Sequence, residues 1–416
     1  MFPHQHLSTK LGTSRALSLV LLLALFLPLL SCGNQTQQGG ADTGTIKIGY
    51  FGDLSGPTFN FGQSAKNGVL LAAAEINQAG GINGRKLDVV IEDDQGSPER
   101  AAMIANKLMH QDNVVALIAG GASGSSLAAG PNAQAAKVPM ISPSSTNPEV
   151  TQIGDYIFRA CFIDAFQGDV MARFAFITLK TKKAAIMLDY NSPYSRGLTE
   201  FFELSFTKLG GQVVSKQSYT QGDADFKGQL SAIAATEPEV IYLPGYYGDI
   251  AIIAKQARQL NLTQPLLGGD GWDAPELWLL GGDALNGSYI SNHYSVDDPS
   301  PATQKFAHDY RLQSGNLAPD AHSALAYDAM RFLAEAIQRV GTQGQKLRDA
   351  LAATKNFPGI TGMISMDKDR NAVKPAVVLK LEDGRYIYLE TIQPEAEPAS
   401  SPTPSPSPSP RRRRKT

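Results

Sequence analysis

The 416-residue chain is poor in cysteine and tryptophan, with two of each, and it carries no large excess of either charge. Two cysteines cannot build the disulfide framework on which small secreted domains depend. The formal net charge is -2 with both signs scattered, so the basic surface that nucleic acid requires is missing. Hydrophobic residues make up 43% and charged residues 18%, which is a globular composition, and the length predicts two domains.

The chain also lacks the common motifs of enzymes and metal sites. It contains no nucleotide phosphate-binding loop, no His-Glu-x-x-His and no Cys-x-x-Cys. Residues 121–125 are placed like a nucleophile elbow, between a strand and a helix, but they do not match Gly-x-Ser-x-Gly. We therefore expect no catalysis, no cofactor and no metal. The histidines beyond the N-terminal segment are not at metal-ligand spacing: His110, His293, His308 and His322.

The longest hydrophobic run lies near the N-terminus. Lys10 and Arg15 precede an apolar stretch at 16–30, followed by Ser31 and Cys32. This order is typical of a signal peptide, predicted at 1–31, and its Leu-Leu-Ser-Cys ending resembles the lipobox of bacterial lipoproteins. We expect acyl chains on Cys32 to anchor the protein in the periplasm or at the cell surface. The alternative is a secretory signal with an incidental cysteine.

Cys161 is the other cysteine of the chain. With Cys32 acylated, no intrachain disulfide is possible. No histidine or helix N-terminus stands beside Cys161 in the sequence to activate its thiol. We expect it to be a small buried hydrophobe.

A flexible tether at 32–44 is followed by two runs of alternating strands and helices. The first run has strands at 46–51, 87–91, 114–119 and 138–142, and the second at 184–188, 213–219, 240–243, 266–267 and 289–292. This alternation predicts an α/β fold with two doubly wound parallel-sheet lobes. We assign 45–164 and 294–368 to lobe 1, and 165–293 and 369–393 to lobe 2.

The C-terminal third of the chain departs from this alternation. Helices predominate at 303–355, and we expect them to pack back onto the first lobe. Three short strands are predicted near Met363, Val377 and Tyr386, and the last of them are expected to extend the second sheet. Residues 394–416 form a Pro- and Ser-rich tail with a basic end, which cannot bury a core and is expected to be disordered. We favour a solvated tail; the alternative is contact with anionic lipid or cell-wall polymer.

Three loops that follow predicted strands carry groups suited to ligand binding, because ligands of such sheets lie beyond the carboxyl ends of the strands. The small-residue loop at 121–125 offers N–H groups and hydroxyls to an anion. The loop at 141–148 carries further hydroxyls and an amide, while Asp270 lies among glycines at 268–273 and suits an ammonium. The alternatives are a tight turn at 121–125 and an Asp270 that caps the helix at Pro275.

Aromatic residues stand in matching loops, where they are more often walls of a site than core. They are Phe61, Tyr190, Tyr194, Tyr246, Tyr247 and Trp272.

Several motifs, taken in order, resemble the leucine/isoleucine/valine-binding family, the type I periplasmic solute-binding proteins of amino-acid ABC importers. The resemblance runs from about Ile46 to about Glu390 and rests on the order and spacing of the motifs together. The motifs are Leu-Ser-Gly-Pro at 54–57, Glu-Ile-Asn at 75–77, Gly-Gly-Ile-Asn-Gly-Arg at 80–85, Ile-Ser-Pro at 141–143, Asn-Pro at 147–148, and Phe-Ile-Asp with Gln-Gly at 162–168.

The resemblance implies two lobes that are joined by three crossover strands and close on the ligand about a hinge. Carried over to this chain, it implies that Ser123 with the loop Ser144, Ser145 and Thr146 binds an α-carboxylate. Thr146 and Asp270 bind the α-ammonium, Tyr194 and Tyr246 close from the second lobe, and Phe61 shapes the side-chain pocket. The implied ligand is a neutral, branched-chain or other aliphatic amino acid, and the implied partner is an inner-membrane ABC permease.

The chain departs from the family at three points. Many members have Glu where this chain has Asp270, many have Ala or Gly near Ser144, and the usual disulfide of the first lobe is missing. The same fold binding urea, a short amide or an aromatic acid is therefore the alternative for the ligand. A sensory ligand-binding protein that signals to a receptor is the alternative for the partner.

Overall fold

The structure is a computed structural model that describes residues 44–394. The expected signal peptide, the lipid site at Cys32, the tether up to residue 43 and the tail from 395 lie outside the described residues. The first lobe is built on a five-stranded parallel sheet of order β2-β1-β3-β4-β5. Its strands are β1 (Ile46–Gly52), β2 (Leu87–Asp93), β3 (Ala116–Ala119), β4 (Met140–Ser142) and β5 (Ile157–Arg159).

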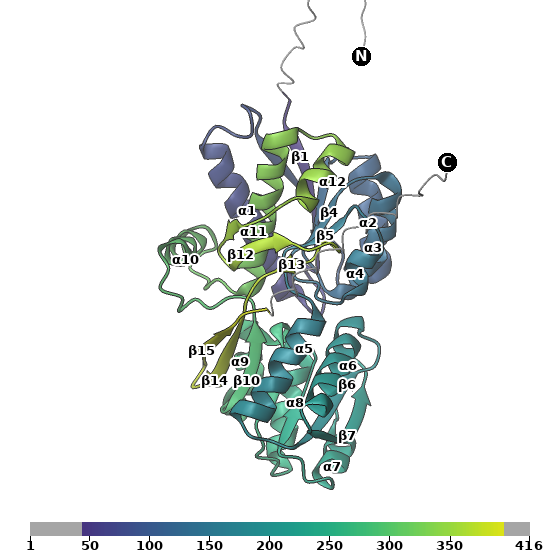
Figure 1. The fold of residues 1–416 in the computed structure, drawn as a ribbon, viewed down its shortest axis with the longest axis vertical. Helices are drawn as coiled ribbons and strands as arrows, with labels where there is room; N and C mark the ends of the chain where they lie inside the picture. The colour runs from purple at the N-terminus through teal and green to yellow at the C-terminus, as the bar shows by residue number, and fades with distance from the viewer. Residues whose placement is uncertain (1–43, 395–416) are drawn as a thin grey trace, which may run out of the picture. The chain divides into compact units, whose positions relative to one another are not determined.

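Helices cover both faces of the first sheet, because each face carries its own apolar cluster. One cluster joins the sheet to α1, α10, α11 and α12, and the other joins it to α2 and α3. The helices are α1 (Phe59–Gln78), α2 (Pro98–His110), α3 (Ser123–Ala136), α4 (Glu149–Gln152), α10 (Pro301–Gln313), α11 (Ala321–Val340) and α12 (Gly344–Ala352). The helices after residue 300 therefore pack on the first lobe, as predicted from the sequence (Figure 1).

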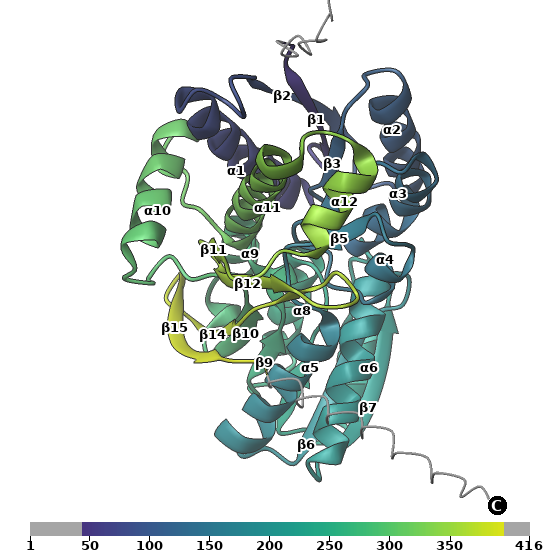
Figure 2. The same cartoon turned by 45° about the horizontal axis from the view of Figure 1, so that its top comes forward.

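The closest helix packing in the first lobe is between α1 and α11, which run side by side (Figures 1 and 2). Gly68 makes this approach possible, because a Cβ there would lie 2.1 Å from the carbonyl oxygen of Ser323. Asp320 caps the start of α11 by accepting a 2.8 Å hydrogen bond from the Ser323 N–H. The N-terminal turn of α11 is thereby held against α1.

The second lobe is built on a seven-stranded sheet of order β15-β14-β10-β9-β8-β6-β7. Strands β6 to β10 are parallel, while β14 and β15 join one edge as an antiparallel hairpin. The strands are β6 (Lys183–Asp189), β7 (Gln212–Tyr219), β8 (Val240–Tyr242), β9 (Leu266–Gly268), β10 (Ser288–Asn292), β14 (Ala376–Glu382) and β15 (Arg385–Ile392). The α/β class and its two parallel-dominated sheets are confirmed.

Helices also cover both faces of the second sheet. One apolar cluster lies beneath α5, η1 and α6, and a second, which contains Trp272, lies beneath α7, α8 and α9. The first helix of this lobe begins at Asp164, and its last turn widens into the π-helix η1. The bounds are α5 (Asp164–Arg173), η1 (Phe174–Thr178), α6 (Pro193–Lys208), α7 (Lys227–Ala234), α8 (Tyr247–Gln259), the 3₁₀ turn η2 (Asp270–Trp272), α9 (Pro275–Gly281) and the 3₁₀ turn η3 (Gly282–Leu285).

One strand is missing from the prediction. Strand β5 has no counterpart in it, because three residues are too short for a periodic pattern. The strand predicted near Met363 is β12, the centre of a separate three-stranded sheet of order β11-β12-β13. That sheet contributes buried residues to the apolar cluster of the first lobe. Its strands are β11 (Phe357–Gly359), β12 (Gly362–Met366) and β13 (Ala372–Val373).

The chain passes between the two sheets three times. The first crossing lies between β5 and α5, the second between β10 and α10, and the third between β13 and β14. Cys161, in the first crossing, is buried as expected, and burial raises the pKa of its thiol to about 12.

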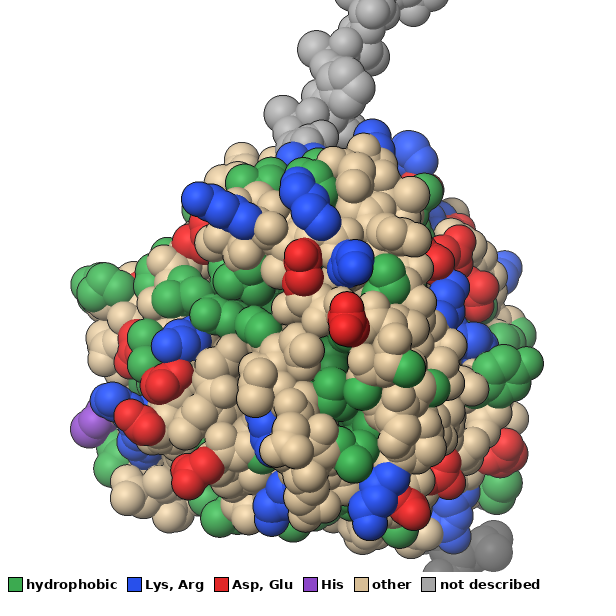
Figure 3. Space-filling model, turned by 90° about the horizontal axis from the view of Figure 1, so that it is seen from below, with side chains coloured by type: hydrophobic (Ala, Val, Ile, Leu, Met, Phe, Trp, Pro, Cys, Tyr) green, Lys and Arg blue, Asp and Glu red, His purple; other side chains and the backbone are tan. Residues whose placement is uncertain are grey.

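Within residues 44–394, no helix has the length and apolar composition that a membrane span needs, and no group of side chains suits a metal ion. On the face drawn in Figure 3, Lys and Arg side chains alternate with Asp and Glu. That face therefore offers no basic patch of the kind that nucleic acid would need.

One buried cation orders the loop that follows β4. The guanidinium of Arg159, with no exposed surface, donates to the carbonyl oxygens of Ser145 at 2.5 Å, Asn147 at 2.8 Å and Pro148 at 3.4 Å. It also donates to the hydroxyl of Thr151 at 3.3 Å. Arg159 thus supplies hydrogen bonds to backbone carbonyl groups of this loop that are not paired with a neighbouring strand.

Replacing this cation should destabilise the fold. In Arg159→Leu the carbonyl groups of the loop stay buried without donors, so we expect the free energy of unfolding to fall by about 3 kcal/mol. Urea denaturation followed by circular dichroism measures the change. Arg100→Leu, at an exposed position on α2, is the matched control and should change stability by less than about 0.5 kcal/mol. Equal effects of the two variants would contradict the assigned role of Arg159.

Candidate ligand-binding site

A small cavity lies where the carboxyl ends of both sheets face each other. Its first-lobe wall comes from α1, the β3–α3 loop, the loop after β4 and the start of α11. Its second-lobe wall comes from the start of α6 and from the loops after β8 and β9. The lining residues are Phe61, Gly121, Ala122, Ser123, Ser144, Tyr194, Tyr246, Asp270, Gly271 and His322.

Most of the residues expected to bind ligand line this one cavity. They are Phe61, Ser123, Ser144, Tyr194, Tyr246 and Asp270. The two others, Ser145 and Thr146, lie behind the lining and are fully buried. The Ser145 hydroxyl shares a hydrogen bond with that of Ser126 at 2.8 Å and donates to the Gly121 carbonyl at 3.1 Å, so it fixes the two first-lobe loops to each other. The Thr146 carbonyl accepts from the Asp164 N–H at 2.9 Å.

Three aromatic residues that the sequence suggested as walls lie elsewhere. Tyr190 is 66% exposed. Trp272 is part of the second-lobe core, where its indole N–H donates to the Leu243 carbonyl at 3.0 Å. Tyr247 packs edge-on against Phe61 but does not reach the cavity. Loop position therefore did not decide which aromatic side chains turn toward the site.

Asp270 is the most strongly hydrogen-bonded group of the second-lobe wall. Its Oδ1 accepts from the Tyr194 hydroxyl at 2.9 Å and from Gln167 Nε2 at 2.8 Å, and its Oδ2 lies 3.2 Å from His293 Nε2. The Tyr194 hydroxyl in turn accepts from the Gly271 N–H at 3.0 Å. Asp270 does not cap the helix at Pro275, whose N-cap is Ala274 without a side-chain bond.

These contacts leave a negative charge in the cavity. Burial disfavours the ionised form of Asp270, but the hydrogen bonds from His293 and Gln167 outweigh it and lower the pKa of the carboxyl. Burial lowers the pKa of His293 to about 4, so that imidazole is neutral at neutral pH. No Lys or Arg lines the cavity. A buried carboxylate without a cation is costly, so its natural complement is a cationic ligand group.

The first-lobe wall has the opposite character. Helix α3 points its N-terminus at the cavity, and its N-cap, Ala122, supplies no side-chain hydrogen bond. The first N–H groups of a helix have no partner within it and favour an anion. The hydroxyls of Ser123 and Ser144 stand beside them, and the Ser123 oxygen also accepts from the Asn147 N–H at 3.4 Å. This wall therefore suits a carboxylate.

Aromatic rings close the remaining sides. Tyr246 stacks on Tyr194 with ring centroids 5.1 Å apart, and it meets Phe61 edge-on at 5.8 Å. Phe61 stacks on His322 at 3.9 Å. The cavity volume in this closed form is about 10 Å³, roughly the space of one water. A larger ligand can enter only when the lobes separate.

Sequence reasoning missed three polar residues of the site. His322 lines the cavity, while Gln167 and His293 hold Asp270 from behind. Gln167 lies in the motif at 162–168, but the motif assigns it no role. The spacing of the two histidines in the sequence excludes only a metal site, and no local pattern predicts that the crossing after β10 and the start of α11 meet the same loop.

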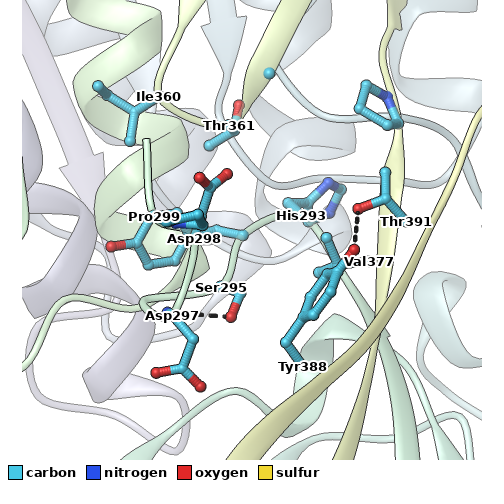
Figure 4. A pocket seen from close by; sticks show the side chains of 13 residues that line it. His293, Ser295, Asp297, Asp298, Pro299, Ile360, Thr361, Val377, Tyr388 and Thr391 are labelled. Atoms are coloured by element: carbon cyan, nitrogen blue, oxygen red, sulfur yellow. Dashed lines mark hydrogen bonds between the residues drawn. The ribbon is translucent and has the colours of Figure 1, made fainter. Parts of the chain in front are cut away.

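His293 also lines a second cavity, of about 250 Å³, behind the second crossing. Side chains from the segment after β10, the turn before β12, and strands β14 and β15 surround it (Figure 4). Within it, the Ser295 hydroxyl accepts from the Asp297 N–H at 3.3 Å, and the hydroxyls of Tyr388 and Thr391 lie 3.0 Å apart. No residue expected from the sequence to bind ligand lies in this cavity.

The chain belongs to the periplasmic binding protein family, whose sequence profile matches residues 45–385. It is similar to Leu/Ile/Val-binding protein homolog 3 of Brucella melitensis, with 28% identity over 83% of this chain and 94% of that protein. Among solved structures, a leucine-binding protein of Thermotoga maritima shares 38% identity with a TM-score of 0.81, over 84% of this chain and 99% of the other.

A second solved relative holds a ligand. The branched-chain amino acid transporter substrate-binding protein of Streptococcus pneumoniae, in complex with isoleucine, shares 33% identity with a TM-score of 0.80. The match covers 84% of this chain and 100% of the other. The resemblance inferred from the sequence motifs is therefore confirmed, as are the two lobes that it implied.

A second carboxyl group lies deeper between the lobes. Asp164, at the start of α5, has no exposed surface, and neither of its oxygens makes a hydrogen bond of good geometry within the described residues. The pKa of Asp164 is raised to about 8, chiefly by burial and also by the nearby charge of Asp270, while the Thr146 hydroxyl and Arg159 act in the opposite direction. Asp164 is therefore largely protonated at neutral pH.

Removing the acidic group of Asp164 should stabilise the protein at high pH. The folded-state pKa lies above the unfolded value of 3.8, so the contribution of Asp164 to stability falls as pH rises between the two. Asp164→Asn does not titrate, so its advantage over the wild type should grow by roughly 3 kcal/mol between about pH 5 and about pH 7.5. Urea unfolding at the two pH values measures it.

Asp283→Asn, at an exposed position in η3, is the control for this experiment and should show no such growth. A constant difference between Asp164→Asn and the wild type would show that Asp164 is ionised in the folded protein.

Proposed function

We propose that this protein captures a neutral amino acid, branched-chain or otherwise aliphatic, between its two lobes and delivers it to an ABC permease. The observation that carries the proposal is the pairing of opposite walls. An uncompensated carboxylate, Asp270, faces the cavity from one lobe, and the N-terminus of α3 with Ser123 and Ser144 faces it from the other. An α-amino acid is the small molecule whose ammonium and carboxylate satisfy both walls at once.

The alternative ligands fit these walls less well. Urea and short amides carry no charge and would leave the Asp270 carboxylate unpaired in a closed site. An aromatic acid offers a carboxylate to the N-terminus of α3, but it has no ammonium and would leave the Asp270 carboxylate unpaired. The relatives named above, which bear the names of leucine- and branched-chain-binding proteins, support the same choice. A sensory protein that signals its closed, ligand-bound form to a receptor would use the same site. Measuring amino-acid transport in a strain that lacks this protein distinguishes the sensory function from delivery to a permease.

Binding should depend on the charge of Asp270. In a thermal-shift screen of all amino acids, urea, short amides and benzoate, we expect a group of neutral amino acids to raise the melting temperature. A ligand at a hundredfold excess over its dissociation constant adds about 2.7 kcal/mol of stability. Asp270→Asn keeps the shape but loses the charge, so it should weaken amino-acid binding at least tenfold, about 1.4 kcal/mol.

Asp249→Asn is the matched control for Asp270→Asn. Asp249 is also a buried carboxyl of the second lobe, but it accepts from the Gly222 N–H at 3.0 Å and lies outside the cavity. The Asp249→Asn variant should leave amino-acid binding unchanged. Stabilisation by urea, an amide or benzoate that survives Asp270→Asn would refute the amino-acid proposal and leave the fold assignment intact.

We also propose that the mature protein is a lipoprotein anchored through Cys32, on the strength of the lipobox-like sequence alone. The two cysteines of the chain provide a direct test. In cells given labelled palmitate, the wild type and Cys161→Ser should be labelled and sediment with membranes. Cys32→Ser should lose the label and move to the soluble fraction, because one fewer acylated residue removes the anchor. Labelling of Cys32→Ser would refute the proposal.

A further inference from the structure

His322 occupies the part of the cavity that neither charged wall accounts for. It is the second residue of α11, and the capping of that helix by Asp320 fixes its backbone. Its ring stacks on Phe61 with centroids 3.9 Å apart and an interplanar angle of 24°. The residue is 4% exposed, and it lines the cavity opposite Tyr246 and Asp270 of the second lobe.

The imidazole of His322 has no side-chain hydrogen-bond partner among the described residues. Neither Nδ1 nor Nε2 makes a hydrogen bond of good geometry within residues 44–394, and the ring has only a weak contact with the Asp270 backbone, which acts to raise its pKa. Burial lowers the pKa of the ring and outweighs the nearby carboxylates of Asp270 and Asp273. A neutral imidazole carries one donor and one acceptor. Buried polar atoms are almost always hydrogen-bonded, so an orphan ring on a cavity wall points to a partner that arrives with the ligand.

The side chain of a bound amino acid would contact the imidazole of His322. If the ammonium faces Asp270 and the carboxylate faces the N-terminus of α3, the side chain is directed at what remains of the lining, which is Phe61, His322 and Tyr246. A purely aliphatic side chain would bury the imidazole with no hydrogen-bond partner beyond its weak contact with the Asp270 backbone. A hydroxyl or a carboxamide can both donate and accept, and it therefore satisfies the imidazole whichever tautomer is present.

We propose that His322 is a specificity-determining residue, and that it selects neutral amino acids whose side chain carries a hydroxyl or an amide. This inference rests on the proposed function and narrows its ligand class. Sites that are built to hydrogen-bond a ligand group reject analogues that lack the group far more strongly than apolar pockets reject an extra methyl.

Two isosteric pairs of ligands test the selection. Threonine and valine differ by a hydroxyl in place of a methyl, and asparagine and leucine differ by an amide in place of two methyls. Titration calorimetry on the purified protein should give at least tenfold tighter binding of the polar member of one pair. His322→Phe keeps the ring stack on Phe61 but has no polar atoms, so it should lose at least tenfold for the polar member and nothing for the aliphatic one.

Two further variants complete the test. His322→Gln retains a donor and an acceptor and should keep much of the polar preference, which a merely structural histidine would not predict. His308→Phe makes the same change at an exposed position of α10 and should behave as the wild type. If circular dichroism shows that His322→Phe does not fold, the test rests on the polar-to-aliphatic affinity ratios of the wild type and of His322→Gln.

The outcomes separate this inference from the proposed function. If valine and leucine both bind as tightly as their polar isosteres, the selection by His322 is refuted while the amino-acid function stands. The selection by His322 is also refuted if His322→Phe leaves the ratio of polar to aliphatic ligand affinities unchanged. If no amino acid binds and Asp270→Asn has no effect, the proposed function itself fails, and the inference with it.

Discussion

The site depends on one constraint, the burial of the ionised Asp270 carboxylate in a cavity that no Lys or Arg lines. Hydrogen bonds from Tyr194, Gln167 and His293 stabilise this charge. Burial keeps Asp164 largely protonated, and the charge of Asp270 adds to this effect because two carboxyl groups that lie close together cannot both ionise cheaply. The electrostatics of the cleft are thus arranged around a cation that the ligand supplies.

The same constraint ties the site to the hinge. His293 belongs to the second crossing and Asp164 follows the first, so groups that set the charge of the site lie where the chain changes lobes. Opening the lobes separates the first-lobe wall of Ser123 and Ser144 from the second-lobe wall of Asp270. Each lobe keeps its own hydrogen-bonded support, with Arg159 behind the first wall and Gln167 behind the second. A ligand with both charges favours the closed form because it alone bridges the two.

Features of the fold and the site could be predicted from the sequence where they depend on residues that are close together in the chain. Strand and helix order followed from local periodicity, and the helix caps Ser97 and Ser192 bond N–H groups only three residues away. The loops that carry Ser123, Ser144 and Asp270 followed from the rule that ligands lie at the carboxyl ends of parallel strands, and the choice of Ser123 and Ser144 followed from the family resemblance. Ser145, by contrast, turns away to bond Ser126 and the Gly121 carbonyl. The face that a loop side chain presents is set by packing against segments distant in sequence.

By itself, then, the sequence determined the α/β class, the two lobes, the family and the groups that the two walls offer to a zwitterion. These depend on patterns that recur within a few residues or on motifs in a fixed order. Only the tertiary structure decided that β11 to β13 form their own sheet, that Trp272 is core, and that His322 and His293 belong to the site. The reason is that contacts between residues far apart in the chain depend on how the elements pack, and no local pattern encodes them.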